Sequence, residues 1–162
     1  MKRRLLLIPA AILAVFLDAF VLPFLSGNGI RPLFTLSLAL AATAATKVQD
    51  GMLIALFGGL LTDLFCNPYI GLSAAAYLIA VAIMYGFTKK GGKPRGLVIL
   101  FAAVGAIAAE AVFLVFSLAI GARFDAFRLL RATLPSIVLE ALLTYPLAAM
   151  LRSREKGSSF HK

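Results

Sequence analysis

The chain has 162 residues, of which 62% are hydrophobic and only 14% are charged. A soluble domain of this size carries about 25% charged residues and about 45–50% apolar ones. So apolar a chain would expose hydrophobic surface on every side in water. The composition therefore excludes an ordinary soluble domain and predicts an all-α membrane protein. No linker divides the sequence, so we expect one integral membrane domain over residues 1–162.

Sixteen Lys and Arg residues against seven Asp and Glu residues give a net charge of +9. In a soluble protein this excess would favour nucleic-acid binding. Here the basic residues form short clusters between apolar runs, which is typical of signals for membrane orientation, so no nucleic-acid partner is expected. The one cysteine, Cys66, lies within an apolar run. We interpret it as a small apolar filler.

Six apolar runs predict a bundle of six transmembrane helices. A span needs about 20 apolar residues to cross a bilayer core of about 30 Å. The first, fifth and sixth runs meet this length, whereas the second and third are short. The first run follows a basic segment, as a signal peptide would, but it is long and lacks a clear cleavage site, so we interpret it as an uncleaved span. The predicted spans are 5–25, 32–46, 51–66, 71–87, 97–120 and 133–151, followed by a basic tail, 152–162.

The distribution of basic residues predicts the orientation. With six spans, both ends of the chain share one side with the second and fourth loops. Twelve basic residues lie on that side and four on the other, so both termini are expected in the cytoplasm of a bacterium, with the chain in its inner membrane. The twelve are Lys2, Arg3, Arg4, Lys47, Lys89, Lys90, Lys93, Arg95, Arg152, Arg154, Lys156 and Lys162, and the four are Arg31, Arg123, Arg128 and Arg131. The loop Gly121–Ala132 predicts a short interfacial helix on the outer face.

Four acids lie within the apolar runs: Asp18, Asp63, Glu110 and Glu140. An ionised acid at the centre of a bilayer costs at least about 2.5 kcal/mol. Each acid should therefore face the bundle interior or a partner, unless it is protonated or hydrogen-bonded locally. Asp18 and Glu110 show no wider pattern. Glu140 belongs to a stripe on one helical face, which is either functional or an ordinary interhelical contact. The stripe consists of Ser136, Glu140, Thr144 and Ala148.

Asp63 is the strongest candidate. One face of the third run is lined with small residues, which let another helix approach closely. Asp63 stands four residues after Gly59, at the edge of this face, and Gly71 opens the next run after Asn67-Pro68. Two roles remain open: Asp63 either pins the loop to Gly71 or receives a hydrogen-bond donor from a partner protein. The small face consists of Gly51, Ala55, Gly58, Gly59 and Thr62.

No catalytic set can be assembled from the sequence. The single histidine, His161, lies in the tail. No Ser/His/Asp set, no Cys/His metal spacing and no Gly-rich phosphate loop occurs within the apolar runs. The sequence therefore predicts a protein that is not an enzyme and that carries no cofactor or metal.

A motif in the second and third runs resembles a known family. An Arg-Pro pair precedes the second run, and a glycine-rich stretch with an Asp-Leu pair forms the third. The matching residues are Arg31, Pro32, Gly51, Phe57, Gly58, Gly59, Leu60, Leu61, Asp63, Leu64, Gly71 and Leu72. The pattern is similar to the rod-shape-determining MreD family of small six-span inner-membrane proteins. The late proline of the last span and the basic tail of that family are matched by Pro146 and Arg152.

The resemblance implies a non-enzymatic role in the machinery that inserts peptidoglycan along the side wall of rod-shaped bacteria. Its members bind MreC, a single-span protein, in a complex that includes a RodA-type glycosyltransferase, a class B penicillin-binding transpeptidase and actin-like MreB. Membrane lipid is a further expected contact. The expected partner-binding or structural residues are Arg31, Pro32, Gly58, Gly59, Asp63 and Gly71, together with Glu110 and Glu140.

A second interpretation is a substrate-binding subunit of an energy-coupling-factor vitamin transporter. These subunits are also six-span bundles, and the expected fold resembles theirs. They often carry an Ala-x-x-x-Ala face on the first span, matched here by Ala10 and Ala14. Against this interpretation, the predicted outer loop Asn67–Ile70 is too short to cap a vitamin.

Overall fold

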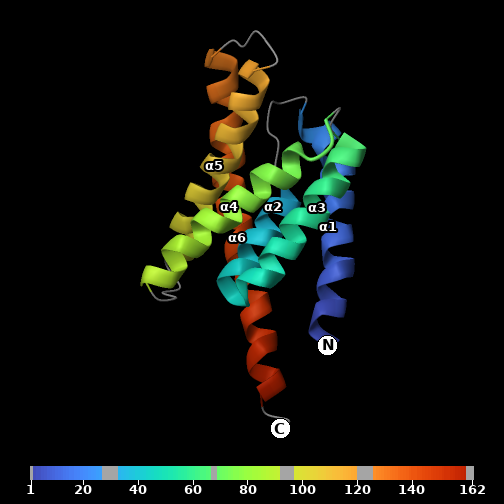
Figure 1. Cartoon of the computed structure of the whole chain (residues 1–162), viewed down its shortest axis with the longest axis vertical. Coiled ribbons are helices and arrows are strands. Elements are labelled where there is room, and N and C mark those ends of the chain that lie inside the picture. Colours follow the sequence, from blue (N-terminus) through green and yellow to red (C-terminus); the bar gives the residue numbers. More distant parts are fainter. Residues whose placement is uncertain (1, 27–32, 67–68, 92–96, 120–125, 160–162) are drawn as a thin grey trace.

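The computed structural model describes residues 2–26, 33–66, 69–91, 97–119 and 126–159, and every element in them is an α-helix. The prediction of an all-α chain is confirmed for these residues. Six helices follow the order of the six predicted apolar runs (Figure 1). They are α1 (Lys2–Ser26), α2 (Phe34–Ala45), α3 (Val48–Cys66), α4 (Leu72–Gly91), α5 (Leu97–Ala119) and α6 (Ala126–Ser159).

Three of the helices are long and apolar enough to cross a membrane. Their apolar stretches are Val48–Phe65 in α3, Val98–Phe116 in α5 and Thr133–Ser153 in α6. The apolar stretches described in α1, α2 and α4 are shorter. The fold is therefore compatible with a membrane protein.

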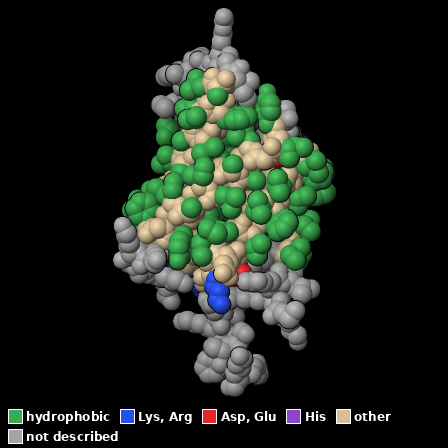
Figure 2. All heavy atoms as spheres, in the orientation of Figure 1, with side chains coloured by type: hydrophobic (Ala, Val, Ile, Leu, Met, Phe, Trp, Pro, Cys, Tyr) green, Lys and Arg blue, Asp and Glu red, His purple; other side chains and the backbone are tan. Residues whose placement is uncertain are grey.

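The surface of the bundle is as apolar as its interior. Large hydrophobic side chains are exposed on every helix except α2, among them Phe20, Phe65, Leu100 and Val138. Figure 2 shows hydrophobic side chains spread over most of the visible face, with the Lys and Arg side chains that are drawn in blue at one end. Such a surface is stable in lipid rather than in water.

Helix α2 lies at the centre of the bundle. It contacts all five other helices, and eleven of its twelve residues are buried. Small side chains, chiefly alanine, allow this close approach. At 1.5 Å per residue the helix is about 18 Å long, well short of a bilayer core of about 30 Å. Both ends of α2 therefore need hydrogen-bonding partners from within the protein.

Consecutive helices run in alternate directions. The start of α1 and the end of α6 lie at the same end of the molecule, and the turn between α2 and α3 lies towards that end as well (Figure 1). At the opposite end, the paired outer parts of α5 and α6 project beyond the other helices (Figure 1).

Two boundaries differ from the sequence prediction. Residues 126–132 are helical, as predicted, but they form the first part of α6 and not a short helix of their own. Residues 152–159 of the predicted basic tail continue α6. Pro135 and Pro146 lie inside this helix and do not end it. The predicted motif residues Arg31 and Pro32 lie outside the described residues.

Candidate functional site

The predicted small face of α3 packs tightly against two helices. A Cβ atom added at Gly59 would lie 2.5 Å from Cα and 2.7 Å from the backbone nitrogen of Ala74, at the start of α4. A Cβ atom added at Gly58 would lie 2.5 Å from Cγ2 of Thr35, at the start of α2. Real Cβ atoms do not approach other atoms so closely, so only glycine fits here without movement. The prediction of close helix contact along this face is confirmed.

Asp63 is fully buried and holds the beginning of α4. Its carboxylate accepts hydrogen bonds from the backbone N–H groups of Gly71 at 2.8 Å and Ser73 at 3.0 Å, and a longer one from Ala74 at 3.5 Å. The first turn of a helix leaves its N–H groups without partners inside the helix, and its positive dipole end favours an anion. Of the two roles that the sequence left open, this geometry is that of the local cap.

Gly71 completes the corner between α3 and α4. Its φ angle is +98°, in a region that only glycine adopts without strain. A side chain at this position would meet no atom within 4 Å, so the requirement for glycine comes from the backbone alone. Gly59, Asp63 and Gly71 thus act together: the first allows α4 to approach, the second caps it and the third makes the turn between the helices.

Asp18 caps the start of α2, as Asp63 caps the start of α4. The Asp18 side chain, on α1, is fully buried and accepts hydrogen bonds from the N–H groups of Phe34 at 2.6 Å and Thr35 at 3.0 Å. Leu33, the residue at the cap position of α2, provides no side-chain hydrogen bond. An acid that the sequence left without a pattern therefore has a defined structural role.

The other end of α2 is held by a basic side chain. The guanidinium group of Arg152, on α6, donates a hydrogen bond of 3.2 Å to the carbonyl oxygen of Ala44. Cations are favourable at the negative end of a helix dipole. With Asp18 at one end and Arg152 at the other, each end of the central helix is hydrogen-bonded by a charged side chain of a neighbouring helix.

The predicted stripe on α6 faces the interior: Ser136, Glu140, Thr144 and Ala148 are all buried. The backbone carbonyl of Glu140 accepts a 2.7 Å hydrogen bond from the Thr144 hydroxyl and a longer one, 3.4 Å, from the Ser37 hydroxyl of α2. The stripe therefore forms part of the contact between α6 and α2. This agrees with the interpretation of the stripe as an ordinary interhelical contact. Glu110, on α5, is half-buried, and its charge acts on the Glu140 carboxyl group.

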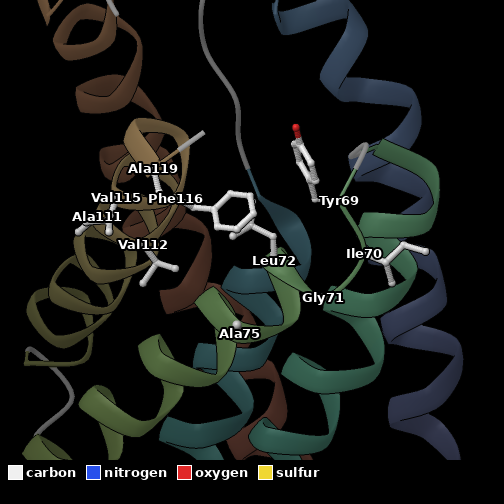
Figure 3. Close-up of a pocket in the computed structure, with 10 residues that line it drawn as sticks. All are labelled: Tyr69, Ile70, Gly71, Leu72, Ala75, Ala111, Val112, Val115, Phe116 and Ala119. Atoms are coloured by element: carbon white, nitrogen blue, oxygen red, sulfur yellow. The ribbon is translucent and has the colours of Figure 1, made fainter. Parts of the chain in front are cut away.

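An apolar groove lies beside the α3–α4 corner. It has a volume of about 650 Å³ and is bounded by residues 69–72 and 75 on one side and by the face of α5 from Ala111 to Ala119 on the other. Figure 3 shows Tyr69 and Phe116 projecting from opposite sides of the groove. Their rings pack edge to face, with ring centroids 5.4 Å apart. Among the described residues that line the groove, Tyr69 is the one with a polar side chain. The groove suits an apolar chain or helix and offers little to orient a polar ligand.

The described residues show no grouping typical of metal binding: nowhere among them do three His, Cys, Asp or Glu side chains come together in a suitable way. Comparison of the chain with known protein families, with curated proteins and with solved structures found no match. The candidate site therefore rests on the geometry of the α3–α4 corner and of the buried polar groups around α2.

Sequence reasoning missed two buried residues of this region, Thr35 and Tyr77. Thr35 is hidden in a helix of alanine, leucine and hydroxyl residues, and Tyr77 lies in an alanine-rich helix where a tyrosine is easily taken for an interfacial residue. One signal was available: Tyr77 follows Ser73 by four residues, so both share a helix face.

Proposed function

We propose that this chain is a non-enzymatic membrane component of the bacterial cell-elongation machinery, similar to the MreD family. One observation carries the proposal. Four described residues of the resembling motif, Gly58, Gly59, Asp63 and Gly71, serve in packing the start of α2 or in building the α3–α4 corner. Residues that fix helix geometry are expected in a protein that presents a rigid surface to partners.

The proposed topology has six spans, with both termini in the cytoplasm of the inner membrane. The alternating helix directions support it, because they bring the helix ends that carry most of the basic residues to one end of the bundle (Figure 1). Lys47, between α2 and α3, and Arg152, which reaches the end of α2, both belong to that end. An excess of basic residues marks the cytoplasmic side of membrane proteins.

The proposed partners follow from the resemblance. The first is an MreC-like single-span protein, and the wider complex would include a RodA-type glycosyltransferase, a class B transpeptidase and actin-like MreB. In this arrangement the chain acts by organising the wall synthases within the membrane, and it carries out no chemical step itself.

The test is purification of the tagged chain from native membranes, with identification of the proteins that co-purify. We expect an MreC-like protein, and we expect depletion of the chain to convert rod-shaped cells into spheres. Intact rod shape on depletion, together with no wall-synthesis protein among the co-purified ones, would refute the proposal.

The vitamin-transporter alternative remains a second candidate. The groove beside the α3–α4 corner argues against it, since nearly all of its lining is apolar. A panel of vitamins added to the purified protein separates the two functions. A binder raises the melting temperature of its target in a concentration-dependent way, so a rise with one vitamin would favour the transporter subunit.

A further inference from the structure

Basic residues gather at one end of the bundle, although they come from distant parts of the chain. The start of α1, the turn between α2 and α3 and the end of α6 lie at this end, and the end of α4 lies towards it as well (Figure 1). In these parts of the described chain, nine basic residues stand against two acids, Asp50 and Glu155. We call the nine the basic rim: Lys2, Arg3, Arg4, Lys47, Lys89, Lys90, Arg152, Arg154 and Lys156.

Two members of the rim come together at the end of α2. Arg152 donates its hydrogen bond of 3.2 Å to the carbonyl oxygen of Ala44, so this side chain of α6 lies beside the last turn of α2. Lys47 follows Ala44 by three residues, and its side chain is exposed. The acid of the neighbouring turn, Asp50, is only 5% exposed. The charge that the described side chains present outward here is therefore positive, and Figure 2 shows blue Lys and Arg side chains at this end.

The rim begins where the apolar stretches of the helices end. Lys89 comes two residues after the apolar stretch of α4, Arg154 comes one residue after that of α6, and Lys47 comes one residue before that of α3. At a rise of 1.5 Å per residue, each is within about 3 Å of an apolar stretch along the helix axis. The headgroup layer on each side of a bilayer is about 5–8 Å thick. The rim therefore lies at the depth of the lipid headgroups.

Exposed apolar side chains next to the rim hold it at this depth. Phe87 of α4 is 46% exposed, and Ile8 of α1 and Met150 of α6 are both 61% exposed. Each stands within four residues of a rim residue on the same helix. Side chains of this kind face lipid tails, so the headgroups of the same lipids are the nearest neighbours of the rim. An anionic headgroup complements the charge of the rim, because Lys and Arg bind phosphate oxygens through charge-assisted hydrogen bonds.

We propose that the basic rim is a binding surface for anionic phospholipids, whose headgroup phosphates contact Lys47 and the basic residues at the ends of α4 and α6. The rim then does more than orient the chain: it selects the lipids that surround the protein. The proposal rests on the membrane location of the chain. It does not depend on which side of the membrane the rim faces, or on the identity of any protein partner.

Thermal unfolding of the purified protein in a neutral detergent tests the proposal. The protein is titrated with phosphatidylglycerol or with phosphatidylcholine carrying the same acyl chains, and unfolding is followed by helical circular dichroism. A ligand that binds the folded state raises the melting temperature. We expect a larger rise with phosphatidylglycerol, and we expect added salt to weaken it, because salt screens exposed charges. Equal rises with the two lipids would overturn the proposal, since the acyl chains alone would then explain the binding.

Two matched double variants locate the site. Lys47→Gln combined with Lys89→Gln removes two charges from the rim, and Arg128→Gln combined with Arg131→Gln removes two from the opposite end of α6. One basic residue near an anionic surface strengthens binding by a factor of about five, so the rim variant should need at least about fivefold more phosphatidylglycerol for half of the rise. The control variant should need no more than the wild type. An equal effect of the two variants, or no effect of the rim variant, would overturn the proposal.

Glycerol phosphate separates a lipid from a soluble anion. It carries a phosphate and a glycerol group, as the phosphatidylglycerol headgroup does, but it has no acyl chains. We expect it to leave the melting temperature of the wild type unchanged at the concentrations at which phosphatidylglycerol acts. A rise equal to that with the lipid would identify a soluble anion as the ligand and would overturn the proposal.

Discussion

Replacing Asp63 tests the central structural claim, that this carboxylate holds the start of α4. Asp63→Ala removes two good hydrogen bonds, from the N–H groups of Gly71 and Ser73. A hydrogen bond to a charged group contributes about 1.5–3 kcal/mol, and the interaction with the helix dipole adds about 0.3–1 kcal/mol. Because such contributions are not fully additive, we expect a loss of about 3–5 kcal/mol in the free energy of unfolding.

Asp63→Asn separates the charge from the hydrogen bond. The amide oxygen of asparagine still accepts a hydrogen bond, but the amide NH₂ group faces N–H donors where the second carboxylate oxygen stood. We therefore expect a loss of about 1.5–3 kcal/mol, smaller than that of Asp63→Ala. Recovery of an MreC-like partner with Asp63→Asn should match the wild type, since the carboxylate is buried and bound within the chain.

The assay is equilibrium unfolding in detergent micelles, followed by helical circular dichroism. Leu64→Ala is the matched control: it stands next to Asp63 on the same helix, but its side chain is 64% exposed, so we expect a change below about 1 kcal/mol. If Asp63→Ala destabilised the protein no more than Leu64→Ala, the capping role would be refuted. Normal stability of Asp63→Asn with loss of the partner would instead favour the partner-binding role.

Three further predictions concern packing, backbone and topology. Gly59→Ala should destabilise the protein by about 1–3 kcal/mol, because the added Cβ meets the backbone of α4. Gly86→Ala is the control: its Cβ meets no atom within 4 Å, so this variant should be neutral in the same unfolding assay. Equal effects of the two would contradict the close contact. Gly71→Ala should lower the free energy of unfolding by about 1–2 kcal/mol through its positive φ alone. Gly71→Asn should lower it less, since asparagine tolerates this region better. Equal losses for the two variants in the unfolding assay would exclude the backbone explanation. Finally, a cysteine at Ser153, in a chain with Cys66 replaced by serine, should resist labelling by an impermeant reagent in intact cells. Labelling there would sink the proposed orientation.

Much of the fold could be predicted from the sequence, because a helix in an apolar chain is encoded locally. Runs of apolar residues gave the number and order of the helices. The spacing of small residues gave the packing face of α3, and the four-residue spacing around Glu140 gave the buried stripe of α6. The partnership of Asp63 with Gly71 could also be anticipated, since only eight residues separate them and the turn between them is short.

The contacts between distant helices were decided only by the tertiary structure. Asp18 reaches N–H groups sixteen and seventeen residues away, and nothing in the sequence around it announces a cap. The backbone carbonyl of Glu140 accepts a hydrogen bond from the Ser37 hydroxyl of α2, 103 residues earlier in the chain. Such meetings depend on the depth, direction and crossing of the helices. These follow from the packing of all six together, whereas the periodicity of any one helix fixes only which of its faces is buried.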